Sequence, residues 1–328
     1  MTTDHELRHA PALQAPAEPL PPVRRNLILF ALTVISVFYA GAVYAAPDDP
    51  RAFFRQLLDL RFLAQGAPFA LPLLAILVTH EFGHFFAARF HRVPASFPYF
   101  IPFPLPPFGT MGAVIAMRGS IRSRNALLDI GASGPLAGLL VAIPALMWGL
   151  SQSAVNPQGE SGYTQEGQSL LYWLLKRIVV GPIPDGHDVW LHPTAFAGWA
   201  GLFLTMINLM PWGQLDGGHI AYSLIGERHH RIAEWFHRGL LLLCGMNVVR
   251  FVVPVWLGQS DLPLALAIGN SQFWLVWFLV LLVIGRLSGG PRHPPCEPGE
   301  LSPMRRAVGW FSLAMFVLLF MPTPLASY

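Results

Sequence analysis

Two histidines and a glutamate lie together in an apolar stretch, in the order His80-Glu81-Phe82-Gly83-His84. On a helix, residues four apart share a face, so His80 and His84 can offer two imidazole nitrogens to one Zn²⁺. Glu81 stands beside this face without being a ligand, where it can take a proton from an attacking water and deliver it to a leaving amine. A bound Zn²⁺ supports this chemistry because it lowers the pKa of water towards about 7. The motif predicts metal-assisted peptide hydrolysis.

A catalytic zinc usually has three protein ligands and one open position, so a third ligand must come from elsewhere in the chain. Asp216 is the carboxylate of a later apolar stretch, and His219 competes with it three residues further on. The pair Asp216-Gly217 is also typical of a turn that ends a helix. In the same stretch, Asn208 is suited to hydrogen-bond a substrate carbonyl or oxyanion, or to make a polar contact between helices.

The composition indicates that these residues lie in a membrane protein. Of 328 residues, 53% are hydrophobic and only 12% are charged, about half of the roughly 25% that a soluble domain carries. These values exclude a disordered protein, a coiled coil and a typical cytosolic enzyme. The basic residues are scattered, so no nucleic acid partner is expected. The two cysteines do not suggest a disulfide framework.

Several segments have the length that crosses a bilayer, about 20 residues. We therefore predict an all-α polytopic membrane protein with about six to seven transmembrane helices and a small membrane-embedded β segment. The expected spans are 26–46, 68–90, 126–150, 194–216, 239–257, 272–287 and 307–325.

The β segment is expected between residues 93 and 125. The prolines at its start forbid a helix, and the apolar run Gly109–Arg118 is too short to span, so it suits a strand or a re-entrant hairpin. Non-helical backbone at membrane depth must be buried in protein or line a wet cavity. The alternative is a cytosolic loop lying on the membrane.

The basic residues also predict an orientation. With the N-terminus in the cytosol, fifteen of them fall in inside segments and five in outside loops. This places 151–193 outside, with an interfacial helix at 169–177, and Tyr328 outside. Residues 1–25 are predicted to be a disordered cytosolic tail. Twenty arginines against one lysine suggest a GC-rich bacterial genome and thus a bacterial cytoplasmic membrane.

Four motifs in order resemble the site-2 protease family of intramembrane zinc metalloproteases. They are the His80–His84 motif, Gly109-Thr110-Met111-Gly112, the glycine-rich run Gly131–Gly138, and Leu215-Asp216-Gly217. The resemblance, over roughly residues 68–238, implies one Zn²⁺ per chain held by His80, His84 and Asp216, with Glu81 as the catalytic base. It also implies that transmembrane protein substrates are cleaved near the cytosolic side of the bilayer. Residues 93–125 would hold unwound substrate by strand addition.

The same resemblance suggests a domain division. Residues 1–25 would be the tail, 26–238 the metalloprotease core, and 239–328 additional C-terminal transmembrane helices. The longest gaps between spans, 151–193 and 288–306, are too short for the PDZ or CBS modules of some relatives. The sequence does not indicate an oligomeric state.

Three other interpretations of these motifs fit the residues less well. A metalloprotease with glutamate as its third ligand would need that residue in a later span, but Glu227 and Glu234 fall in the predicted cytosolic loop. A metal transporter or receptor has no evident need for Glu81 and would line several spans with polar groups. A catalytically dead relative would be expected to lack Glu81 or one of the ligands.

Overall fold

The computed structural model describes residues 23–45, 53–105, 107–117, 121, 123–159, 162–287, 293, 296–297 and 299–328. The predicted tail therefore lies outside the described residues up to position 22, and the first helix begins at Val23. Most of the described chain is helical, as the composition predicted.

Within the described residues, four helices are long and apolar enough to cross a membrane. A fifth candidate span is the pair α11 and α12, which meet at an angle of 44°. The described residues thus give four or five candidate spans by length and composition, fewer than the six to seven predicted. The four helices are α1 (Val23–Ala45), α4 (Ala67–Phe90), α5 (Arg124–Ser151) and the continuous run Arg228–Trp256; the pair is α11 (Leu264–Ser271) and α12 (Phe273–Leu287).

Two predicted spans form helices that are just shorter than the 18 residues required of a candidate span. They are α7 (Pro193–Asn208), with 16 residues, and α13 (Pro303–Leu319), with 17. The expected span 194–216 is wrong in its second half, because α7 ends at Asn208 and α8 (Asp216–Ile225) follows after a turn. Pro211 has no N–H to donate to a helix, and Gly213 has a positive φ of 53°, so the helix breaks here.

The predicted loop after residue 225 is shorter than expected. Helix α9 (Arg228–Asn247) begins eleven residues before the expected span at 239 and continues through the π-helical turn η2 (Val248–Val252) into α10 (Val253–Trp256). Hydropathy did not predict where this helix begins, because its first three turns hold most of its arginines and histidines. Shorter helices fill the connections: α2 (Phe53–Leu58), α3 (Leu60–Ala64) and α6 (Leu170–Val179). Helix α6 confirms the helix predicted at 169–177.

In the part of the chain that the structure describes, the β structure consists of three antiparallel two-stranded sheets. Strand β1 (Tyr99–Pro102) pairs with β2 (Thr110–Val114), which confirms a strand in the run 109–118. This hairpin lies along α1, where Ser36 Oγ donates to the Gly109 carbonyl at 2.6 Å. The other pairs are β3 (Ala154–Pro157) with β5 (His187–Trp190), and β4 (Thr164–Glu166) with β6 (Leu325–Ser327).

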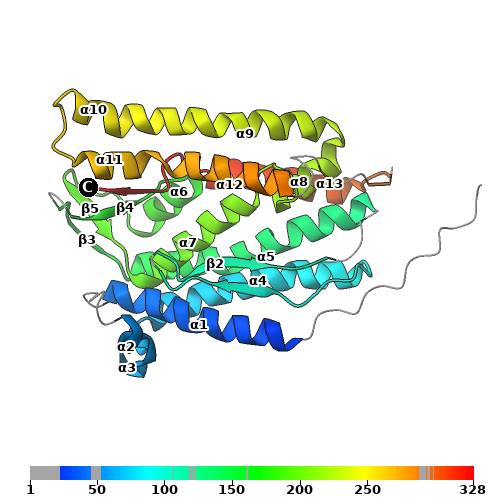
Figure 1. The fold of residues 1–328 in the computed structure, drawn as a ribbon, viewed down its shortest axis with the longest axis horizontal. Helices are drawn as coiled ribbons and strands as arrows, with labels where there is room; N and C mark the ends of the chain where they lie inside the picture. The colour runs from blue at the N-terminus through cyan, green and yellow to red at the C-terminus, as the bar shows by residue number, and fades with distance from the viewer. Residues whose placement is uncertain are drawn as a thin grey trace, which may run out of the picture.

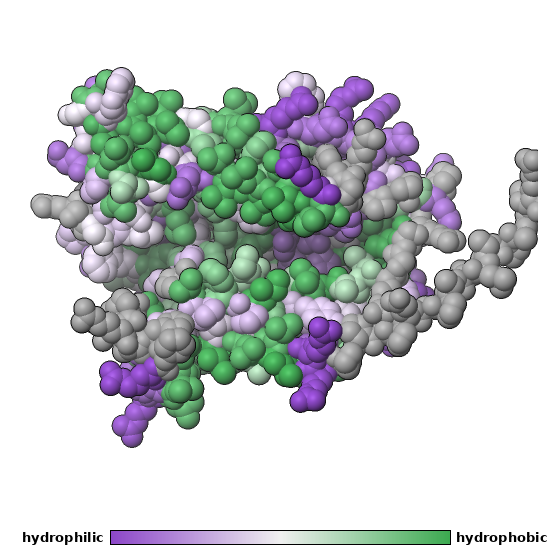
Figure 2. Space-filling model, viewed as in Figure 1, coloured by the Kyte–Doolittle hydropathy of each residue, from purple (hydrophilic) through white to green (hydrophobic). Residues whose placement is uncertain are grey.

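The long helices run roughly side by side, and the first described residues and the C-terminus lie at opposite ends of the molecule (Figure 1). The sheets β3–β5 and β4–β6 gather at the C-terminal end, whereas α8 and the start of α9 lie at the other. Apolar side chains cover much of the face between, and the densest hydrophilic group lies where α9 begins (Figure 2). This pattern suits helices that cross a bilayer lengthwise.

Helix α5 lies at the centre and packs against α4, α7 and α8. The C-terminal helix α13 joins the same core, since the carboxylate of Asp129 on α5 accepts from Arg305 at 2.9 Å. Gly309 lies so close to Leu128 and Leu224 that a Cβ there would be 3.0 Å from each. The core therefore includes the last helix of the chain as well as the segments that carry the motifs.

Candidate metal centre

Three side chains from two distant segments converge between α4 and α8. His80 and His84 lie one turn apart on α4, with their Nε2 atoms 3.2 Å from each other. Asp216 Oδ2 lies 3.4 Å from His80 Nε2 and 3.3 Å from His84 Nε2. Among the residues that the structure describes, this is the one group of three or more His, Cys, Asp or Glu side chains whose ligand atoms all lie within 4.8 Å.

The spacing of these atoms suits a zinc ion. Ligands at the usual zinc distances of about 2.0–2.1 Å, placed at tetrahedral angles, lie about 3.3–3.4 Å apart. The observed separations of 3.2, 3.3 and 3.4 Å match that edge length. Two imidazoles and one carboxylate also form a donor set that zinc accepts in catalytic sites, with a fourth position left open. The residues present therefore fit a catalytic zinc.

Helix α5 fixes the orientation of His84. The Nδ1 atom of His84 lies 2.7 Å from the Ile130 carbonyl oxygen, so this nitrogen carries the proton and donates it. The Nε2 lone pair is then free to bind a metal, which is how outer hydrogen bonds usually orient histidine ligands. Sequence reasoning missed this role of Ile130, because every residue has a carbonyl and no side-chain signal marks it.

The glycine-rich run makes room for both imidazoles. A Cβ at Gly134 would overlap the ring of His84, and one at Gly138 would lie 3.2 Å from His80 Nδ1. Gly134 and Gly138 are four residues apart on α5, a spacing that lets another helix approach closely. The structure confirms that approach and shows that the groups approaching are the two histidine rings.

Asp216 is placed by a tight turn. It is the first residue of α8. The alternative interpretation of Asp216-Gly217, a turn that ends a helix, is therefore wrong. A carboxylate at this position is favoured by the helix dipole. A Cβ at Gly217 would overlap the Leu209 carbonyl, and one at Gly218 the Gly213 carbonyl. Two successive glycines thus let the start of α8 fold back against the end of α7 and bring Asp216 to α4.

Asn208, Glu81 and His219 complete the surroundings. Asn208, the last residue of α7, has its Nδ2 atom 3.2 Å from His80 Nε2. Glu81 follows His80 directly and is 5% exposed, so its carboxylate is shielded from bulk water. The His219 ring is buried, with its Nδ1 atom 2.7 Å from His293 Nε2. The geometry favours Asp216 over His219 as the third ligand.

Comparison with known families agrees with this geometry. The model of peptidase family M50 matches residues 68–252, more than half of the chain. The chain belongs to the M50 family. The resemblance to site-2 proteases is thereby confirmed, and the match includes α4, the β1–β2 hairpin, α5, α7 and α8, the segments that build the candidate centre.

Several plant proteins are similar to this M50 chain. "Probable zinc metalloprotease EGY1, chloroplastic" from Oryza sativa subsp. japonica is 34% identical over 62% of this chain and 38% of its own length. The protein of the same name from Arabidopsis thaliana is 29% identical over 90% of this chain and 52% of its own. "Probable zinc metalloprotease EGY2, chloroplastic" from Oryza sativa subsp. indica is 31% identical over 74% and 46%. The chain spans about half or less of the length of these relatives.

Proposed function

We propose that this chain is an intramembrane zinc metalloprotease that hydrolyses peptide bonds in or near the transmembrane segments of membrane proteins. The observation that carries the proposal is the convergence of His80, His84 and Asp216 at zinc-ligand spacing, with Glu81 buried beside them. Membership of the M50 family, and similarity to plant proteins named as probable zinc metalloproteases, support it.

Each residue has a distinct role in this proposal. His80, His84 and Asp216 hold Zn²⁺, which supplies a Lewis acid and acidifies water. Glu81 removes the proton of the attacking water and passes it to the amine of the departing peptide. The Asn208 amide donates to the oxygen on which negative charge develops as the scissile carbonyl is attacked. The Ile130 carbonyl keeps His84 in the tautomer that presents Nε2.

The lipid bilayer and transmembrane substrates are the expected partners. In this proposal α7 and α13 also cross the membrane, which together with the candidate spans of the structure gives the seven crossings predicted from the sequence. The β1–β2 hairpin lies at membrane depth and holds unwound substrate. The N-terminus is cytosolic, and the membrane is a bacterial cytoplasmic membrane. Residues 26–238 form the protease core and 239–328 add C-terminal helices, a boundary that falls within α9.

A paired assay tests the proposal. Glu81→Gln removes the proton carrier and keeps the ligands, so cleavage of a single-span model substrate should fall by about 10²–10⁴-fold while zinc content stays the same. Glu234→Gln, a change of the same type at a half-buried position of α9 that is not part of the candidate metal centre, is the matched control and should cut normally. Full cleavage by Glu81→Gln would refute the mechanism. Loss of zinc together with cleavage would show that Glu81 supports the metal site instead.

A further inference from the structure

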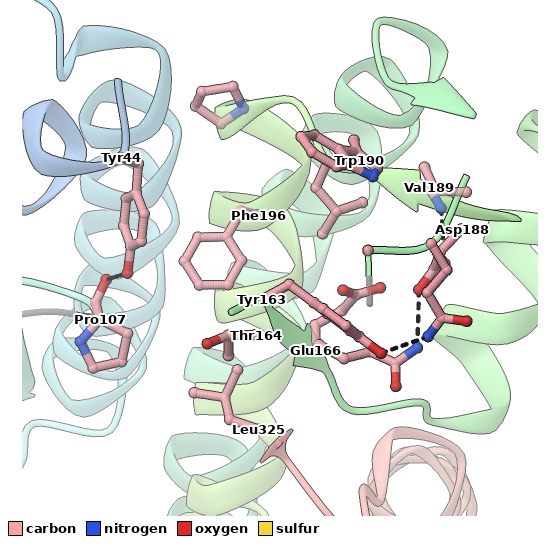
Figure 3. Close-up of a pocket in the computed structure, with 15 residues that line it drawn as sticks. Tyr44, Pro107, Tyr163, Thr164, Glu166, Asp188, Val189, Trp190, Phe196 and Leu325 are labelled. Atoms are coloured by element: carbon pink, nitrogen blue, oxygen red, sulfur yellow. Dashed lines mark hydrogen bonds between the residues drawn. The ribbon is translucent and has the colours of Figure 1, made fainter. Parts of the chain in front are cut away.

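A cavity of about 720 Å³ lies away from the candidate metal centre, at the end of the molecule where β4, β5 and the C-terminus meet (Figure 3). Tyr44 of α1 and Pro107 form one wall, joined by a 2.6 Å hydrogen bond from the tyrosine hydroxyl to the proline carbonyl. Phe196 of α7 and Trp190 of β5 face them from the other side. The cavity thus lies between α1 and the sheet end of the molecule.

The polar part of the wall carries excess negative charge. Glu166 and Asp188 line the cavity, and both pair with Lys176 behind them, at 3.0 and 3.3 Å. Two carboxylates therefore share one ammonium group. Partial burial acts to raise the pKa of Asp188, but the charge of Lys176 and hydrogen bonds from Val189 and Gln165 bring that pKa below its ordinary value. Asp188 is ionised at neutral pH, and none of the described residues that line the cavity is basic.

The apolar part of the wall is rich in aromatic faces. Tyr44, Tyr163, Trp190 and Phe196 all line the cavity, and Trp190 is 60% exposed. Aromatic faces attract ammonium and guanidinium groups, most strongly where carboxylates add to the field. A cavity with aromatic walls, two carboxylates and no basic side chain among its described residues is complementary to an organic cation.

The cavity is connected to the candidate centre through α7. Phe196 stands near the start of this helix and Asn208 at its end, twelve residues later, which at 1.5 Å per residue is about 18 Å. A transmembrane helix lying along α7 would therefore reach both sites at once. Phe108, from the connection after β1, packs against Phe196 and Phe203 of α7, so it lies along the segment that such a substrate would follow.

We propose that this cavity binds a lysine or arginine side chain in the flank of the substrate's transmembrane segment, about 18 Å from the bond that is cut, the length of α7 between Phe196 and Asn208. The inference rests on the proposed function, which supplies the substrate, and it adds a recognition site for one end of that substrate. Under the proposed orientation the cavity is on the outer side of the membrane. Glu166 and Asp188 carry two negative charges and Lys176 only one positive charge. The bound cation supplies the second positive charge.

Binding to the full chain with the Glu81→Gln change, in phosphatidylglycerol nanodiscs, tests the inference without requiring cleavage. The probes are two fluorescent single-span peptides that differ only in lysine or alanine at the outer flank. We expect the lysine peptide to bind about tenfold more tightly, the size of one desolvated charge pair. Adding Asp188→Asn should bring the two peptides to equal affinity. Asp185→Asn, an exposed carboxylate outside the cavity, should keep the tenfold preference.

Trp190→Ala is a second variant, because its exposed side chain can be removed without opening the core. It should reduce the lysine preference several-fold. The inference is wrong if the Glu81→Gln chain binds both peptides equally. It is also wrong if the preference for the lysine peptide survives Asp188→Asn and Trp190→Ala. If phosphatidylethanolamine in the nanodisc abolishes the preference, the cavity takes a lipid amine and the inference is also wrong. Cleavage of the same peptides by the unaltered chain tests the proposed function separately.

Discussion

The imidazole of His84 occupies the space that a side chain at position 134 would need. The same ring donates its Nδ1 proton to the Ile130 carbonyl, one turn earlier on α5. Helix α5 therefore holds a metal ligand of α4 from two directions, by exclusion and by a hydrogen bond. Neither ring rotation nor a change of tautomer is open to His84 while the two helices stay packed.

The first prediction concerns this contact. Gly134→Ala places a methyl group in the ring of His84, so the histidine must turn away and zinc affinity should fall by about 10–100-fold, the usual cost of disturbing a ligand's support. Elemental analysis after dialysis against a weak chelator measures it. Gly239→Ala in α9 is the matched control: no atom lies within 4 Å of a Cβ there, so zinc should stay and the helix should gain up to about 1 kcal/mol of stability. Normal zinc content in Gly134→Ala would show that the site can relax around the methyl group.

The second prediction separates the two possible third ligands. His80→Ala, His84→Ala and Asp216→Asn should each reduce zinc from about one ion per chain, because each removes one of three protein ligands. His219→Ala should keep the metal, since its Nδ1 atom is engaged with His293. The measurement is zinc per chain in detergent-purified protein of matched fold. Full zinc and activity in Asp216→Asn, with loss of both in His219→Ala, would reverse the assignment.

The third prediction concerns Asn208. If its amide donates to the developing oxyanion, Asn208→Ala should lower kcat about 10²–10³-fold, the range for loss of one such donor, with KM and zinc content nearly unchanged. Steady-state kinetics with a model substrate, together with metal analysis, resolve these effects. A rise in KM at constant kcat would instead assign Asn208 to ordinary substrate binding. Loss of zinc would show that its contact with His80 supports the ligand.

The sequence was most informative where one local pattern determines the outcome. The spacing of His80 and His84 needs only a helix to bring the two rings together, and α4 is apolar along nearly all of its length. Residues 109–118 could be recognised as non-helical because of the prolines before them. The glycine pair at 134 and 138 indicated close packing for the same reason, since small residues four apart share one face.

Other features depend on contacts that no local pattern records. The turn between Asn208 and Asp216 reverses the chain against α7 through Gly217 and Gly218, so an apolar stretch that reads as one span is two helices. The start of α9 is hidden by its charges. The carboxylates of the cavity shown in Figure 3 come from β4 and β5, short strands whose pairing with β6 and β3 involves residues far apart in the chain. The residue type alone made Asp216 a candidate ligand. Only the folded structure shows that it lies beside His80 and His84 of α4.

The last prediction tests the orientation. Arginines concentrate at the end of the molecule where α9 begins, and the positive-inside rule assigns that end to the cytosol. Glu227 is exposed there, whereas Asp185 is exposed in the loop before β5 at the opposite end. In a background with Cys244→Ala and Cys296→Ala, a membrane-impermeant maleimide applied to intact cells should label Asp185→Cys at once. Glu227→Cys should react only after the membrane is permeabilised. The two positions are separated by helices that run the length of the molecule (Figure 1), so one reagent reports both sides.

Labelling of Glu227→Cys from outside, with protection of Asp185→Cys, would invert the orientation. The outer cavity would then face the cytosol, and a basic residue on the cytosolic flank of the substrate would be the one to bind there.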